Sequence, residues 1–212
     1  MYLPKHFAET DVAAMHALMR AHPLATVVHS GPQGLSANHL PLHLVAEPAP
    51  SGCLQGHVAR ANPLWKEAAS EAPVLVIFNG PEHYISPSTY ATKGRDGRVV
   101  PTWNYVAVHA HGRLRVIDDP AWVAAQMQAL TSTHEAGRAA PWSVEDAPAD
   151  YIERMRTAVV GIEIVITRLE GKWKVSQNQP AVNQDSLIAA LEADNTEKST
   201  TMARLIRQHR KP

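Results

Sequence analysis

The chain has 212 residues, of which 45% are hydrophobic, and its 20 lysines and arginines balance its 20 aspartates and glutamates. This length can bury a sizeable core, and it predicts a single domain over residues 1–212 with a helical extension from about residue 184. The balanced charge argues against proteins that bind nucleic acid or membranes through a global positive field.

The cellular compartment is indicated by cysteine usage and by the N-terminal residues. Cys53 is the single cysteine and cannot form an internal disulfide, which fits the reducing cytoplasm. The first residues mix charged, proline and aromatic side chains, so they lack the apolar core of a signal peptide. No apolar run approaches the roughly 20 residues that cross a bilayer. We therefore expect a cytoplasmic protein with no membrane partner.

The first half of the chain predicts one helix followed by several strands. Residues 10–22 carry an apolar stripe at helical spacing and end before Pro23. Strands are predicted at residues 24–30, 35–46, 54–60 and 73–78, and a short helix at residues 65–69. Pro41 interrupts the second strand, which places it at an edge, at a bulge or beside a ligand.

Residues 80–112 hold most of the unusual side chains, in two strand-like segments around a polar loop. Alternation puts Tyr84 and two serines on one face of the first segment, and Trp103 and Tyr105 on one face of the second. The loop at residues 93–98 carries three cations and predicts a mobile hairpin connection. Aromatic planes, hydroxyls and cations in this density would suit a flat anionic ligand. The alternative is a hairpin with ordinary aromatic cross-strand pairs.

The second half predicts more helices around one strong strand. Helices are expected from Asp119-Pro120, at residues 148–156 and, as a pair, within residues 184–210. A strand is expected at residues 159–169, with a turn at Gly171 into residues 172–176. The whole pattern predicts a mainly β (α+β) fold, in which a meander of antiparallel strands closes or partly closes a barrel.

One stretch offers a candidate anion site. Arg60 ends a predicted strand, and Asn62-Pro63 supplies an N-cap and a first-turn proline to the following helix. A guanidinium beside unpaired helix N–H groups can seat a phosphate. His39 would line the same pocket in a hairpin register. The alternative is an arginine on a surface turn beside an ordinary helix cap.

Other chemistries find less support. His109 and His111 share a strand face, as do His39 and His43, but no carboxylate or cysteine pair completes a metal site, and no metal is predicted. The serines lack a nucleophile elbow and no phosphate-loop glycine pattern is present, so no catalytic residue is assigned. The charges of the last helix surround it, which does not match a DNA-reading helix.

Seven segments, in the same order, resemble the PaiB-type proteins, a family labelled as FMN-binding negative transcriptional regulators. The segments are residues 1–7, 22–26, 39–42, 56–63, 84–87, 100–105 and 176–178. The similarity covers nearly the whole chain, and PTWNY after YISP is its most specific part.

The resemblance implies a homodimeric split β-barrel of the FMN-binding type, with two flavins at the subunit interface. It implies a phosphate seat at His57, Arg60 and Asn62, and it places a second strand beside the flavin ring. The residues of that strand are Asn38, His39, Leu40 and Pro41. A third group would approach from the same or the partner subunit, and its members are Tyr90, Lys93, Thr102, Trp103 and Asn104.

Three functional classes stay open at this point. The family label implies a repressor that contacts promoter DNA or acts through a small molecule. The split-barrel resemblance also implies a flavin-dependent oxidoreductase, like pyridoxamine-phosphate oxidases and flavin reductases. A haem-binding or haem-degrading protein is the third class, in which the 12 histidines would matter.

Overall fold

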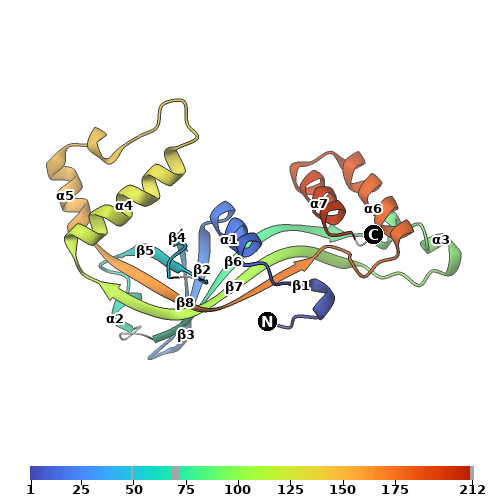
Figure 1. The fold of residues 1–212 in the computed structure, drawn as a ribbon, viewed down its shortest axis with the longest axis horizontal. Helices are drawn as coiled ribbons and strands as arrows, with labels where there is room; N and C mark the ends of the chain where they lie inside the picture. Colours follow the sequence, from blue (N-terminus) through green and yellow to red (C-terminus); the bar gives the residue numbers. More distant parts are fainter. Residues whose placement is uncertain (49, 68–71, 211–212) are drawn as a thin grey trace. The chain divides into compact units, whose positions relative to one another are not determined.

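The computed structural model describes residues 1–48, 50–67 and 72–210, which form an antiparallel β-sheet with helices around it (Figure 1). The eight strands are β1 (Ala8–Glu9), β2 (Leu24–Gly31), β3 (Gly34–Pro41), β4 (His43–Val45), β5 (Cys53–Ala59), β6 (Ala72–Ile85), β7 (Thr102–Ile117) and β8 (Val159–Lys174). Their order in the sheet is β3-β2-β6-β7-β8-β5-β4, and β1 pairs with β8.

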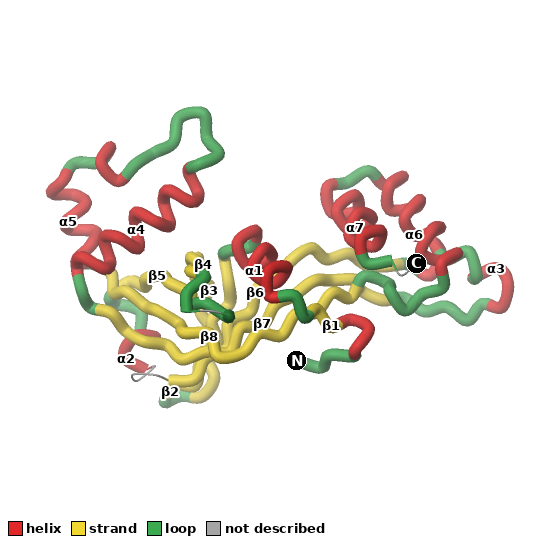
Figure 2. Tube along the Cα trace, viewed as in Figure 1, coloured by secondary structure: helices red, strands yellow, loops and turns green. Residues whose placement is uncertain are grey.

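Seven α-helices and three short 3-10 helices lie within the described residues (Figure 2). The α-helices are α1 (Val12–Ala21), α2 (Leu64–Glu67), α3 (Lys93–Asp96), α4 (Pro120–Glu135), α5 (Ala149–Thr157), α6 (Ala181–Asp194) and α7 (Glu197–Gln208). The 3-10 helices are η1 (Lys5–Phe7), η2 (Pro87–Thr89) and η3 (Val144–Asp146). Among the described residues, none of these helices has the length and apolar character needed to cross a membrane.

The chain forms two compact units. The first contains residues 1–11, 79–108 and 170–212, and the second contains residues 12–78 and 109–169. The strands β6, β7 and β8 each contribute residues to both units.

The second unit contains the β2–β3 hairpin, and side chains along its strand β2 alternate between buried and more exposed positions. In β2, Ala25, Val27 and His29 are buried while their neighbours are more exposed, as a strand with one face in the core requires. β2 pairs with β3 in a register that sets Thr26 opposite His39. The other face of the core comes from β5 and β8, where Gly56 lies opposite Ile162.

The first unit contains the helix pair α6 and α7, and these two helices pack against each other (Figure 1). Their contact is apolar, because Leu187, Met202 and Ile206 are almost completely buried. Thr196 caps α7 by accepting a hydrogen bond from the Ser199 amide at 3.1 Å.

Most predicted elements are confirmed, and the exceptions have physical causes. The predicted turn at Gly171 is wrong: Glu9 and Ala8 pair with Gly171 and Lys172, so the ladder of β8 continues to Lys174. The strand expected to end at residue 78 continues as β6 to Ile85.

The segment between β6 and β7 also differs from the expectation. The serines after Tyr84 are not on a strand, since Pro87–Thr89 is a 3-10 helix capped by Ser86. The predicted hairpin loop contains the short helix Lys93–Asp96. The helix predicted at residues 65–69 is observed at Leu64–Glu67, and the rest of that prediction lies outside the described residues.

Candidate functional site

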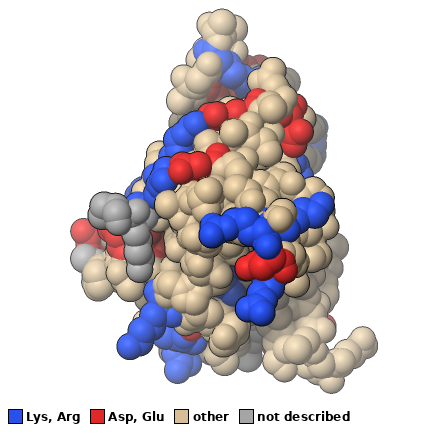
Figure 3. All heavy atoms as spheres, turned by 90° about the vertical axis from the view of Figure 1, so that its right-hand side faces the viewer, with Lys and Arg blue, Asp and Glu red and all other residues tan. Residues whose placement is uncertain are grey.

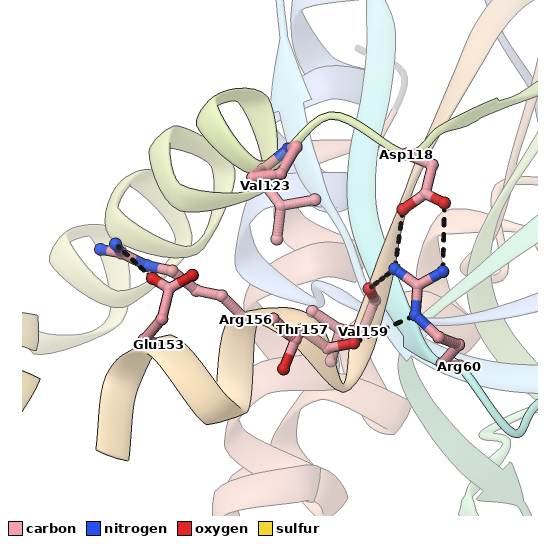
Figure 4. A pocket seen from close by; sticks show the side chains of 8 residues that line it. Arg60, Asp118, Val123, Glu153, Arg156, Thr157 and Val159 are labelled. Carbon is pink, nitrogen blue, oxygen red and sulfur yellow. Dashed lines mark hydrogen bonds and ion pairs between the residues drawn. The ribbon is translucent and has the colours of Figure 1, made fainter. Parts of the chain in front are cut away.

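Arg60 lies directly after β5, and its guanidinium makes four hydrogen bonds to neighbouring acceptors (Figure 4). Its Nη1 and Nη2 donate to the two carboxylate oxygens of Asp118 at 3.1 and 2.7 Å. Its Nε donates to the Thr157 carbonyl at 3.0 Å, and Nη2 donates to the Val159 carbonyl at 3.1 Å. These bonds from Arg60 hold the pKa of Asp118 below its usual range. Arg60 therefore joins the end of β5 to the end of α5, to the start of β8 and to Asp118, which lies between β7 and α4.

A cavity of about 290 Å³ lies beside this pair. It is lined by Arg60, Asp118, Pro120, Val123, Glu153, Arg156, Thr157 and Val159 (Figure 4). Arg156 and Glu153 approach each other to 3.9 Å, so both arginines of the lining face a carboxylate. An anion entering here competes with these carboxylates for the two guanidinium groups.

The other predicted residues of the second unit form a small network of amides and imidazoles. Asn62 Nδ2 donates to Asn38 Oδ1 at 2.8 Å, and Asn62 Oδ1 accepts from the Leu64 amide at 2.9 Å. His39 Nδ1 and the Thr26 hydroxyl lie 3.1 Å apart. The structure thus brings Asn38 and Asn62 into contact, whereas His39, which was predicted to line the Arg60 pocket, contacts Thr26 across the hairpin and is not in the lining of the cavity at Arg60.

His57 and the β3 end complete the group in this unit. His57 Nδ1 lies 2.8 Å from Gln126 Oε1, and the Gln126 Nε2 is buried with no partner among the described residues. Leu40 is buried in the core, whereas Pro41 at the end of β3 is exposed. Asn38 and His39 are successive residues of β3, so their side chains point to opposite faces of the sheet. Of the four predicted residues Asn38, His39, His57 and Asn62, side-chain hydrogen bonds within the described part of the chain join only Asn38 and Asn62 to each other.

The remaining predicted residues lie in the first unit. Tyr90 and Asn104 are 4% and 1% exposed, so their side chains face the interior of that unit. Trp103 is 52% exposed and stacks edge-to-face on Tyr84 with ring centroids 5.8 Å apart. Lys93 Nζ donates to the Ser88 hydroxyl at 3.3 Å. Thr102 accepts a hydrogen bond from Lys174 Nζ.

A second cavity of about 130 Å³ gathers three of these residues. Its lining consists of Tyr90, Val100, Thr102, Asn104, Lys174, Ser176, Asn178 and Gln179. Four of these eight lie after residue 168 and were not predicted as site residues. A usable signal existed, because residues 176–178 were one of the seven segments of the family resemblance. No sequence signal pointed to Lys174, Asp118 or Gln126.

Comparison with known proteins decides the family. Residues 1–168 match the family described as “Putative FMN-binding domain”. The chain belongs to this FMN-binding-domain family. A protein of Bacillus subtilis called protease synthase and sporulation protein PAI 2 is 28% identical over 97% of this chain and 96% of its own length. The resemblance to PaiB-type proteins is therefore confirmed. An uncharacterized protein of Emericella nidulans is 34% identical over 98% of this chain and 97% of its own.

Solved structures confirm the fold of this family member. The FAD and haem binding protein from Mycobacterium smegmatis superposes with a TM-score of 0.60 at 18% identity, covering 86% of this chain and 79% of that one. A flavocytochrome from Azotobacter vinelandii gives a TM-score of 0.58 at 18% identity, covering 79% and 69%. The split barrel of antiparallel strands is thus the fold of this chain, and the family and fold together support a flavin as its class of cofactor.

Proposed function

We propose that this protein binds FMN at the interface of a homodimer and acts as a PaiB-type regulator that responds to the flavin. The observation that carries the proposal is the extent of the family match. Residues 1–168 include all twelve residues that the sequence predicted as flavin contacts, whereas α6 and α7 lie outside it.

The phosphate seat of this proposal consists of the Asn38–Asn62 pair, His57 and Arg60, which make separate side-chain contacts and would turn toward a bound phosphate. The Asn38–Asn62 hydrogen bond uses one N–H of the Asn62 amide and leaves the other for a ligand. The Arg60 guanidinium would exchange part of its Asp118 contact for the phosphate. Both side chains of that pair are about half exposed, so the exchange requires no buried charge to be left unpaired.

The ring side of the proposal rests on the exposed indole of Trp103. This side chain on β7 is 52% exposed, so a flavin ring in the assembled dimer can reach it. A bound flavin supplies a redox-active ring, and Trp103 of the same or the partner subunit would contact it and exclude water from one of its faces.

The homodimer is supported by the character of β3. It is the first strand of the sheet order and pairs only with β2 among the described strands, so its other edge presents backbone hydrogen-bonding groups. Leu35 on this strand and Leu24 on β2 are 83% and 67% exposed. A second copy of the chain would cover such an edge, and light scattering of the purified protein measures whether it does.

The test of the flavin is a visible absorption spectrum of the purified protein, repeated after FMN is added and the excess removed. We expect retained flavin bands at about one flavin per subunit. The variant Arg60→Ala should bind FMN about 10- to 100-fold more weakly, because a charge-assisted hydrogen bond is lost. Arg156→Ala is the matched control, since Arg156 lines the same cavity but lies outside the predicted seat.

The same samples separate the alternatives. A protein that retains no FMN would overturn the flavin proposal, and equal affinity in Arg60→Ala would overturn the role of Arg60 alone. A Soret band would favour the haem class. Turnover of a reduced nicotinamide by the flavin-loaded protein would favour the oxidoreductase class over the regulator.

A further inference from the structure

The small cavity of the first unit is polar, and its lining contains a cation but no carboxylate. Its lining side chains are one lysine, one phenol, two hydroxyls, three amides and one valine. At about 130 Å³ it is well below the roughly 300 Å³ of sites for larger ligands, so it cannot enclose a flavin. Lys174, Ser176, Asn178 and Gln179 also lie beyond the residues that match the FMN-binding family.

Lys174 supplies the positive charge of this cavity. Its ammonium donates to the Thr102 hydroxyl and, at 2.8 Å, to the Trp103 carbonyl. An ammonium has three N–H donors, so one is left without a partner among the described residues. Burial lowers the pKa of Lys174, Tyr105 offsets part of this, and the nearby charge of Lys172 lowers it further. An anion beside the ammonium would favour its charged form.

Tyr90 adds a second donor that lacks a partner. Tyr90 is only 4% exposed, and its hydroxyl makes no hydrogen bond to any described residue. The Ser176 hydroxyl is close enough to offset part of the rise that burial causes in the pKa of Tyr90. A buried hydroxyl without a partner lowers the stability of the fold, and a ligand that accepts its hydrogen bond would remove this cost.

The backbone of the cavity wall is strained and held in place. Ser176 has a φ of 64°, in the left-handed region that a non-glycine residue rarely adopts. Its hydroxyl bonds the buried Asn104 amide at 2.9 Å, and its carbonyl accepts from Gln184 Nε2 at 3.1 Å. Strain that several buried contacts maintain is typical of binding sites.

We propose that this cavity binds a small organic monoanion through its carboxylate. The ammonium of Lys174 supplies a single positive charge, which matches one carboxylate better than a phosphate dianion. The hydroxyl of Tyr90 donates to the same carboxylate, and the amides of Asn178 and Gln179 contact the rest of a ligand of a few heavy atoms. The site does not depend on the flavin proposed above.

The test is a titration of the isotope-labelled full chain with acetate, propionate and lactate, followed by amide NMR at constant ionic strength. We expect saturable shifts at residues 100–104 and 174–179. Lys174→Met should weaken binding at least about tenfold and Tyr90→Phe several-fold. Lys5→Met is the matched control, because Lys5 is an exposed lysine of the same unit outside the lining and should leave binding unchanged.

Several results would overturn the assignment. They are shifts that do not saturate, unchanged affinity in a well-dispersed spectrum of Tyr90→Phe, and equal binding of inorganic phosphate. Repeating the titration with FMN present keeps the two proposals separate. Carboxylate binding that persists with and without FMN supports this site whether or not the flavin binds, whereas competition between the two would make the cavity part of the flavin site and overturn it.

Discussion

Cys53 illustrates how burial and a side chain on a paired strand set the chemistry of a thiol. The thiol is 5% exposed, and its Sγ lies 3.9 Å from Glu163 Oε2. Burial and then the negative charge of Glu163 raise the pKa of Cys53 from 9.0 to about 11. The reactive thiolate is therefore scarce at pH 8 in the folded protein.

We expect iodoacetamide to alkylate native Cys53 at pH 8 about 100-fold or more slowly than the urea-unfolded chain, as a two-unit pKa difference dictates. The unfolded thiol ionises first, so its contribution to stability is present below pH 9 and is lost as pH rises toward about 11. Mass spectrometry of quenched samples gives the rates, with Cys53→Ser as the unreactive control. Equal rates in the folded and unfolded states would contradict the burial argument.

Arg60 shows what the sequence can and cannot predict at this scale. Its position at the end of a strand, before a capped turn, was predictable from local residues. Its partner Asp118 lies 58 residues away, and no local pattern couples the two. The Thr26–His39 contact was within reach of prediction, because the hairpin register sets these two residues opposite each other. Asn62, in contrast, follows a strand that does not pair with β3, so no local pattern predicts its contact with Asn38.

At the scale of elements, α4 packs on β8 through a glycine. A Cβ added at Gly161 would lie 2.5 Å from the Trp122 ring and 2.8 Å from the Ile117 carbonyl oxygen. The carbonyl belongs to the backbone of β7 and cannot move aside. The flat surface that Gly161 leaves on β8 is therefore what lets the tryptophan of α4 approach the strand.

We expect Gly161→Ala to lower the free energy of unfolding by about 1–3 kcal/mol, the usual cost of overpacking. Gly137→Ala is the matched control, because nothing lies within 4 Å of a Cβ at that glycine. Urea denaturation followed by circular dichroism measures both. A Gly161→Ala protein as stable as the control would show that Trp122 does not pack as described.

The boundaries of elements were predictable where capping residues or prolines set them, as at Asp119 and Pro120. They were not predictable where pairing with a distant strand overrides a local breaker. Gly171 stays in β8 because β1, from the other end of the chain, pairs with it. The split barrel itself was reached through family resemblance and strand count, whereas the lengths of β6 and β8 depend on their neighbours in the sheet.

For the molecule as a whole, charge pairing bears on whether the regulator role proposed above could involve direct contact with DNA. Arg207 pairs with Glu192, Lys198 with Glu82 and Arg210 with Asp185. On the face in view in Figure 3, lysines and arginines stand beside acidic side chains. Together with a net charge of zero, these pairs leave little positive field to attract the DNA backbone without help from a ligand.

The flavin-free protein should therefore bind a duplex of arbitrary sequence weakly, with a log–log salt slope shallower than about −2 in fluorescence anisotropy between about 50 and 200 mM salt. The triple variant with Glu82→Gln, Asp185→Asn and Glu192→Gln keeps the side-chain shapes and releases three cations. If those cations then reach phosphates, the slope steepens by up to about 0.9 for each. A steep slope already present in the wild type would mean that cations elsewhere on the surface contact DNA directly, and the regulatory role would then not need the flavin.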